Sequence, residues 1–370
     1  MNDGRARDLR SLGACFQVHG TLVEAAPHGS GHINETYAAT YDQAGTRVRY
    51  VHQRINGHVF REPLRLMDNV SRVLSHAATR LAGLPDASRR ALTLVPARDG
   101  RPYVIDDEGA VWRTYLFIEH TRTYDIVETP AQAEAAARAF GQFQALLADL
   151  PGDRLHDTIP DFHHTRRRFD AFAAAVDADP CNRAHACRDL IALAFAHEAD
   201  ADRLIAAAEA GAVPERVTHN DTKINNVMMD VATGEALCVV DLDTTMAGLA
   251  PIDFGDMVRT ATNAAAEDER DVSKVASRPE MFEALVRGYL SAAGTFLQPA
   301  EIDWLAFSGQ LLAFEQAIRF LGDHVQGDTY YRIHHPGHNL DRARAQMALM
   351  ASIERQRDAY QAIVRKHAHG

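Results

Sequence analysis

The first third of the chain consists of short apolar–polar alternations, the pattern of β-strands. One helix interrupts them, because apolar side chains recur at helical spacing from Pro63 to residue 81. Pro63 stands where a first helical turn tolerates proline. The predicted strands are Phe16–Ala25, Ile33–Tyr41, Thr46–Ile55, Leu92–Pro96, Pro102–Ile105 and Val111–Glu119.

From Pro130 onward the pattern becomes helical. Residues 130–150 are alanine-rich with large apolar side chains on one side, and residues 165–210 continue in the same way. Two short strands break this region, at Asn225–Asp230 and Ala236–Val240, with a turn between them. After Pro251 the helical pattern returns.

A β-rich segment followed by helices that one hairpin interrupts is the layout of a kinase. The sequence therefore predicts an α+β, two-lobed, protein-kinase-like fold with a β-rich N-lobe and a mostly helical C-lobe. We expect a nucleotide-binding lobe over residues 1–119. The helical lobe, with the catalytic loop and substrate site, is expected over residues 120–370.

Composition narrows the function classes. The formal net charge of the 370 residues is −11, which argues against partners that need a basic face, namely nucleic acid and anionic membranes. No run approaches the ~20 apolar residues of a membrane helix, and the first residues form no apolar secretory segment. The four cysteines are scattered, which favours a reducing, cytoplasmic compartment.

The segment His219–Asn226 carries the strongest chemical signal. It has the form His-x-Asp-x-x-x-x-Asn. Phosphoryl transfer needs a carboxylate that accepts the proton of the attacking hydroxyl, and Asp221 suits this role. Lys223 is placed to neutralise the transferred phosphate, and Asn226 to help hold Mg²⁺. His219 is expected to pack beneath the loop and fix its shape.

A second aspartate completes the motif. Asp241 ends the apolar strand Leu237–Val240, one short hairpin after Asp221. We expect it to bind Mg²⁺ that bridges the phosphates of ATP. Asp243 is expected either to support the metal-binding residues from behind or to lie on the substrate side, and it could bind metal as well. Read alone, Asp241–Thr245 also matches the nucleophile motif of haloacid-dehalogenase-type phosphatases, but the further lysine and parallel strands of that class are not evident.

These motifs identify a resemblance. His219–Asn226, Val239–Asp241 and Gly248–Asp253 resemble the aminoglycoside phosphotransferase and choline kinase-like superfamily. The stretches HGSGHINETY, HNDTKINN, IRFLGDHVQGDTYY and HNLDRARAQ resemble the bacterial N-acetylhexosamine 1-kinases of that superfamily. The resemblance implies that Asp221 is the base, that Asn226 and Asp241 hold metal, and that Asp253 braces the catalytic loop.

The nucleotide side contains an anomaly. Gly29, Ser30 and Gly31 form a turn whose backbone amides can approach phosphate oxygens. Kinases usually pair the phosphates with a lysine on the third strand, yet no lysine precedes Lys223. Arg54 is the expected replacement, and Asp68 on the following helix is a candidate partner; Glu62 is another.

The prediction of the acceptor-binding residues depends on the family resemblance. It implies sugar contacts from His32, Arg319 and Tyr330, and hence phosphorylation of the anomeric hydroxyl of N-acetylglucosamine or N-acetylgalactosamine with ATP as co-substrate. A kinase for another hydroxylated molecule, such as an aminoglycoside, an amino alcohol or another sugar, remains the alternative. A non-catalytic nucleotide-binding protein of kinase ancestry is disfavoured because Asp221, Asn226 and Asp241 are all present.

Overall fold

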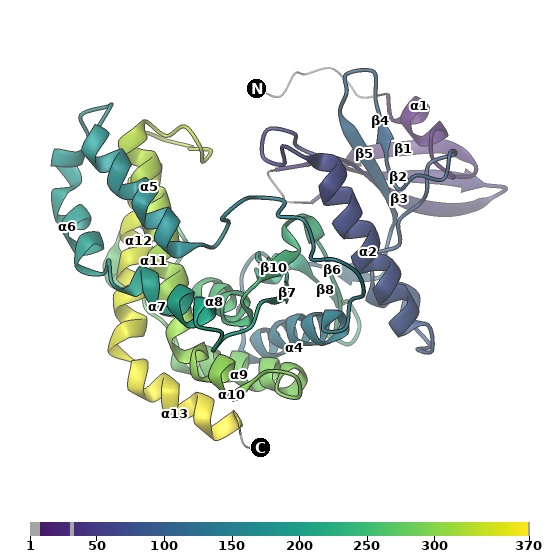
Figure 1. Ribbon diagram of the computed structural model, residues 1–370. Coiled ribbons are helices and arrows are strands. Elements are labelled where there is room, and N and C mark those ends of the chain that lie inside the picture. Colours follow the sequence, from purple (N-terminus) through teal and green to yellow (C-terminus); the bar gives the residue numbers. More distant parts are fainter. Residues whose placement is uncertain (1–7, 30–32, 369–370) are drawn as a thin grey trace.

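The small lobe is built on a five-stranded antiparallel sheet (Figure 1). The structure is a computed structural model and describes residues 8–29 and 33–368. The sheet order is β1-β2-β3-β5-β4. The strands are β1 (Thr21–Pro27), β2 (Glu35–Gln43), β3 (Thr46–Arg54), β4 (Val104–Ile105) and β5 (Val111–Leu116).

The two faces of this sheet are buried against different partners. On one face Tyr41, Tyr50 and Trp112 pack with Phe16, next to helix α1 (Leu9–Ala14). On the other face Val111 and Tyr115 join the main core together with helix α2 (Pro63–Leu81). The sequence predicted the bounds of α2, and its apolar stripe is buried as expected. A one-turn helix, α3 (Ala87–Arg90), follows.

The large lobe is helical, and two helix contacts organise it. The crossing of α4 and α9 is close, because a Cβ at Gly141 would lie 2.8 Å from the Tyr289 carbonyl oxygen. Helix α11 is central and packs against α5, α8 and α12. The helices are α4 (Pro130–Leu147), α5 (Thr165–Ala178), α6 (Arg188–Ala196), α7 (Asp200–Glu209), α8 (Ala250–Ala261), α9 (Pro279–Ala293), α10 (Pro299–Asp303), α11 (Leu305–Gln326), α12 (His338–Arg355) and α13 (Arg357–Ala368).

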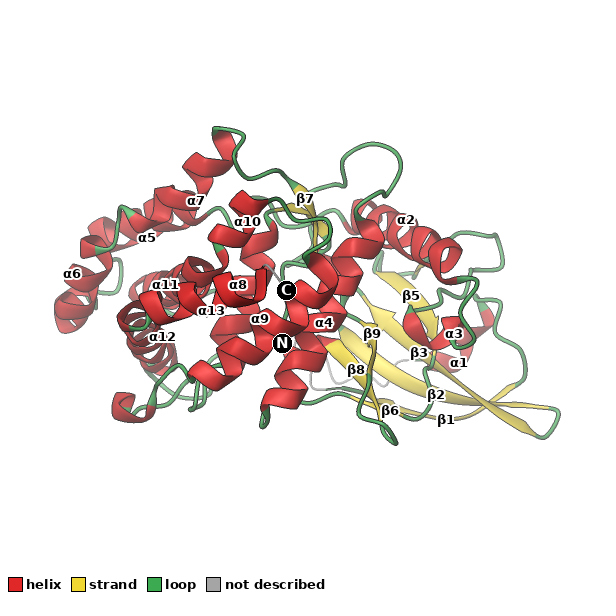
Figure 2. Ribbon diagram, turned by 90° about the horizontal axis from the view of Figure 1, so that it is seen from below, coloured by secondary structure: helices red, strands yellow, loops and turns green. Residues whose placement is uncertain are grey.

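Two small antiparallel sheets carry the motif loops (Figure 2). The predicted hairpin is confirmed as β8 (Val227–Asp230) and β9 (Ala236–Val239), and β6 (Thr121–Arg122) extends it in the order β6-β8-β9. Strand β7 (Arg216–Thr218) pairs with β10 (Met246–Gly248). The catalytic segment therefore leaves β7 and enters β8, while the segment after Asp241 runs from β9 into β10.

Some predicted boundaries were wrong. The strand predicted from Phe16 begins only at Thr21, because Phe16 forms a single bridge with Ala97 and the residues between it and Thr21 are irregular. Leu92–Pro96 lies along β5 through a single bridge, from Leu94 to Tyr115, without becoming a named strand. Strands β7 and β10 have three residues each, too few to show a period. No helix among residues 8–29 and 33–368 is long and apolar enough to cross a membrane.

Candidate active site

The loop after β7 brings three predicted residues together. Asn220 has φ +64°, a left-handed conformation that asparagine tolerates better than most residues. This turn presents Asp221, whose carboxylate accepts a hydrogen bond from Asn226 Nδ2 at 3.1 Å. Lys223 Nζ lies 3.1 Å from the other carboxylate oxygen, and the charge of Asp221 raises the pKa of Lys223. The loop thus holds a partly exposed carboxylate between an amide and an ammonium group.

Asp253 fixes the shape of this loop from below. Its carboxylate is fully buried at the start of α8 and accepts the backbone N–H groups of His219 at 2.8 Å and Asn220 at 2.7 Å. Gln144 Nε2 donates a third bond at 2.6 Å. His219 is buried as well, and its Nε2 lies 2.9 Å from the Val240 carbonyl oxygen. The structure therefore places His219 and Asp253 under the loop, as the resemblance implies.

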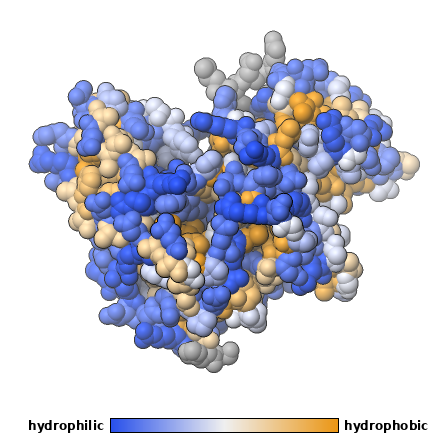
Figure 3. All heavy atoms as spheres, in the orientation of Figure 1, coloured by the Kyte–Doolittle hydropathy of each residue, from blue (hydrophilic) through white to orange (hydrophobic). Residues whose placement is uncertain are grey.

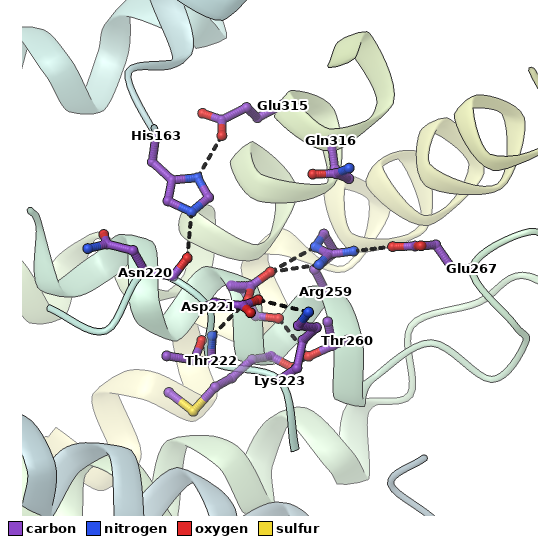
Figure 4. A network of polar contacts seen from close by, with 12 residues as sticks. His163, Asn220, Asp221, Thr222, Lys223, Arg259, Thr260, Glu267, Glu315 and Gln316 are labelled. Carbon is purple, nitrogen blue, oxygen red and sulfur yellow. Dashed lines mark hydrogen bonds and ion pairs between the residues drawn. The ribbon is translucent and has the colours of Figure 1, made fainter. Parts of the chain in front are cut away.

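A second support was not anticipated from the sequence (Figure 4). His163 Nε2 lies 2.9 Å from the Asn220 carbonyl oxygen, and its Nδ1 lies 2.7 Å from Glu315 on α11. Burial alone would lower the pKa of His163, but the Glu315 carboxylate outweighs it and the pKa is raised. The imidazolium form donates to both acceptors at once. A lone histidine in the turn before α5 and a lone glutamate on α11 carry no motif that could have revealed this contact.

Asp241 follows β9 in a left-handed conformation, φ +59°. Val240 N–H donates to the Asn226 carbonyl oxygen at 2.9 Å, so Asp241 lies beside the end of the catalytic loop. The side chain reaches solvent, yet protein surrounds it closely enough that lost hydration, followed by the charges of Asp243 and Asp221, raises its pKa to about 6. A carboxylate in such surroundings is suited to a cation.

The donor set fits Mg²⁺ bound together with phosphates. Asp241 makes no hydrogen bond or ion pair with the described residues, and Asn226 uses its amide nitrogen on Asp221, leaving its oxygen available. Within the described ranges, no cluster of three or more His, Cys, Asp or Glu could hold a metal. Mg²⁺ commonly takes one or two protein oxygens and completes its shell with phosphate and water.

Asp243 lies in a supporting position and not on the substrate side. Its side chain is 2% exposed, Arg113 Nη1 lies 2.5 Å from one carboxylate oxygen, and Asn34 Nδ2 donates to the other at 2.7 Å. Both partners belong to the small lobe. This corrects the expectation that Asp243 faces the substrate, because a buried carboxylate with both oxygens engaged has nothing left for a ligand.

The predicted pair of Arg54 and Asp68 is not formed. Arg54 pairs with Glu35 at 2.9 Å and with Glu108 at 3.5 Å. Asp68 is half exposed and lies near Arg72 of α2 and His156 in the loop between α4 and α5. Alternation along β3 explains this result. Arg54 shares a face with Trp112 on the side of the sheet away from α2. Its neighbour Gln53 points to the opposite face.

The glycine turn is described in part. Gly29 follows β1 with φ +83°, and no atom of the described residues lies within 4 Å of where a Cβ would be. This backbone is free to approach a ligand. The other predicted residues of this turn, Ser30, Gly31 and His32, lie outside the described residues.

The predicted acceptor side lies on α11 and the loop after it. Arg319 is partly buried, stands over the Phe162 ring at 5.3 Å and donates to Gln316 at 3.3 Å. Arg168 on α5 is close enough that, after burial, the charge of Arg319 is the main cause lowering its pKa. Tyr330 is 62% exposed. Figure 3 shows the surface hollowed between this part of the large lobe and the small lobe.

The fold and this loop define a small-molecule phosphotransferase of the kinase-like class. The family model for the phosphotransferase enzyme family (APH) matches residues 24–300, and the chain belongs to that family. Asp241 follows a strand of an antiparallel sheet, which rules out the alternative reading as a dehalogenase-type phosphatase with its parallel strands.

Solved structures agree on the fold. A microcompartment-associated aminopropanol kinase is 16% identical, with a TM-score of 0.57 over 95% of this chain and 98% of that one. An aminoglycoside phosphotransferase from Alicyclobacillus acidocaldarius is 15% identical, with a TM-score of 0.57 over 93% and 92%. A spectinomycin phosphotransferase in complex with ADP and spectinomycin is 13% identical, with a TM-score of 0.54 over 96% and 99%.

Proposed function

We propose that the protein is an ATP- and Mg²⁺-dependent sugar kinase of the cytoplasm. It transfers the γ-phosphoryl group of ATP to the anomeric hydroxyl of an N-acetylhexosamine, giving the sugar 1-phosphate and ADP. The observation that supports phosphoryl transfer is the geometry of the catalytic loop, in which Asp221 lies between Asn226 and Lys223, next to the unpaired carboxylate of Asp241.

Each of these side chains has a defined task in the proposal. Asp221 accepts the proton of the hydroxyl as its oxygen attacks the γ-phosphorus, and the bond to the ADP oxygen breaks. Lys223 offsets the negative charge of the transferred group. Asn226 and Asp241 would hold Mg²⁺, which supplies positive charge against the β- and γ-phosphates. The braced backbone keeps Asp221 in place without rearrangement during the reaction.

The charge of the acceptor side favours a neutral substrate. Arg168 and Arg319 form no ion pair with any described carboxylate, and Glu315 nearby is committed to His163 and Thr165. Two such guanidinium groups repel a cation. Amines are the substrates that the names of the aminopropanol kinase and the aminoglycoside enzymes indicate, and these two arginines do not favour an amine. A forked guanidinium suits sugar hydroxyls and the acetamide carbonyl.

The proposal is tested by phosphorus NMR on the products from N-acetylglucosamine, N-acetylgalactosamine, spectinomycin and 1-amino-2-propanol. We expect an anomeric phosphate signal from the N-acetylated sugars alone. Arg319→Ala should raise the KM for the sugar by ~10²-fold or more, because a polar site discriminates strongly when a bonded partner is lost. The KM for ATP should stay within a few-fold.

A matched control is Arg167→Ala, since Arg167 is an exposed arginine on α5 that pairs with Asp161 at 2.5 Å. It should leave both KM values unchanged. Phosphorylation at another carbon, or turnover of the amines only, would refute the acceptor assignment while leaving the phosphotransferase family unaffected.

A further inference from the structure

The small lobe lacks the lysine that kinases use against the nucleotide, but it does contain a buried cation. Arg113 in β5 is 1% exposed, although its strand neighbours Trp112 and Tyr115 are large and apolar. Burying an arginine in such surroundings is costly unless its charge is paired. Its position therefore needs a specific reason.

Strand register places Arg113 on the face of the sheet that meets α2 and the main core. Arg113 pairs in register with Gln53, and Tyr115 with Val51, whereas Trp112 pairs with Arg54. Tyr115 and Val51 belong to the core that contains α2. The guanidinium is held by Gln53 Oε1, which accepts from Nε at 2.9 Å and from Nη2 at 2.6 Å. Its remaining nitrogen, Nη1, is directed at the large lobe.

The partner of that nitrogen is Asp243, two residues after Asp241. The ion pair joins the sheet of the small lobe to the short 3₁₀ turn Leu242–Thr244 that follows Asp241. Asn34 of the small lobe binds the second carboxylate oxygen, and its own Oδ1 accepts Asn56 N–H at 2.9 Å. The small lobe thus holds the segment that carries Asp241 from two sides.

We propose that Arg113 is a positioning residue for the metal-binding carboxylate of Asp241. Arg113 acts through Asp243. The ion pair between them fixes the backbone at Asp241, and this fixes the position in which the Asp241 carboxylate would bind the Mg²⁺ of the metal–nucleotide complex. Arg113 touches neither the phosphates nor the acceptor in this assignment. The proposed role of Arg113 rests on the phosphotransferase function proposed above, but not on the identity of the acceptor.

The test compares Arg113→Met with Arg54→Met by titration calorimetry of ADP, with and without Mg²⁺. Arg54 is the matched control: an arginine on the adjacent strand, also paired with carboxylates, on the other face of the same sheet. For Arg113→Met we expect the Kd of Mg²⁺·ADP to rise at least about tenfold. A change of this size lies within the range of interaction free energies measured between residues in contact. The Kd of metal-free ADP should change less than about twofold, and Arg54→Met should change neither.

A thermal unfolding curve on each variant separates positioning from stability. A lowered Tm with unchanged Mg²⁺·ADP affinity would overturn the proposal, and so would an equal loss of affinity with and without Mg²⁺. If Arg113→Met does not fold, the double variant Arg113→Met/Asp243→Asn removes both charges and leaves no unpaired ion. The double variant should bind Mg²⁺·ADP equally weakly, and wild-type affinity in it would refute the role of the pair. No acceptor is needed, so failure here is distinguishable from failure of the sugar assignment.

Discussion

The loop after α11 depends on one carboxylate, and this dependence gives a quantitative prediction. Asp323 is 4% exposed. Its Oδ1 accepts the N–H groups of Thr329 and Tyr330, both at 2.8 Å, and its Oδ2 accepts Tyr331 N–H and Asn339 Nδ2, both at 2.9 Å. The loop that carries Tyr330 is therefore wrapped around a single side chain.

Asp323→Asn keeps the shape but replaces one oxygen with an amide that can only donate. Thr329 Oγ1 also donates to Oδ1 at 3.3 Å, so the carboxylate accepts five hydrogen bonds. An amide nitrogen in place of Oδ2 removes two of them, and a hydrogen bond to a charged group contributes about 1.5–3 kcal/mol. The lower end of that range, about 3 kcal/mol for both bonds, corresponds to roughly a hundredfold change in the population of the native loop. Water at the surface replaces part of this loss. We therefore expect the KM for the acceptor to rise between about tenfold and a hundredfold.

Steady-state kinetics with each substrate varied in turn measures this effect. The KM for ATP should stay within about twofold, because the loop lies on the acceptor side. Asp189→Asn is the control, an aspartate on α6 whose side chain is 97% exposed; it should leave both constants unchanged. If folded Asp323→Asn protein retains the wild-type KM for its acceptor, the loop does not form part of the acceptor site.

Three further predictions concern the catalytic loop. Asp221→Asn should lower kcat by ~10²–10⁴ with little change in ATP affinity, and turnover within a few-fold of wild type would exclude it as the base. The pKa of His163 is raised in the folded protein, so its contact with Glu315 stabilises the fold fully below the pKa of the unfolded chain and less as the pH rises through the folded pKa. The Tm difference between wild type and Glu315→Gln should therefore be larger at pH 5.5 than at pH 8.5. An equal difference at the two pH values would refute this prediction. Gly248→Ala should lower the Tm and kcat together, because the new Cβ would meet the Thr218 hydroxyl at 2.3 Å; unchanged values would show that the strand adjusts at little cost.

The sequence predicted those parts of the molecule whose structure is set by residues that lie close together along the chain. Helix α2 and the β8–β9 hairpin each carry a full period, and their bounds follow from it. The catalytic loop was predictable because Asp221 and Asn226 lie five residues apart and the loop itself sets their geometry. Asp253 was placed only through the family resemblance.

Contacts between segments far apart in the chain could not be predicted from local sequence patterns. His163 reaches Glu315 across 152 residues, and Arg113 reaches Asp243 across the two lobes. Arg54 was chosen because it is the cation at the end of the third strand, but the two-residue period of a strand puts it on the wrong face. The one available signal was overlooked: an arginine in the middle of the apolar strand Val111–Leu116.

The small lobe contacts one half of the site directly, through the segment that follows Asp241, and this contact bears on mechanism. Asn220 and Asp241 both adopt left-handed backbone conformations, which persist only where the surroundings impose them. At Asn220 the constraint comes from the large lobe, through Asp253 and the carbonyl contact to His163. At Asp241 it comes from both lobes: in the large lobe Val240 N–H donates to the Asn226 carbonyl oxygen and Thr244 Oγ1 donates to the His219 carbonyl oxygen, and in the small lobe Arg113 pairs with Asp243. A movement of the lobes relative to each other would therefore act first on the metal-binding carboxylate, because the segment that follows it contacts both lobes. Substitutions on the large-lobe side should therefore act on kcat, and those on the small-lobe side on the affinity for the metal–nucleotide complex.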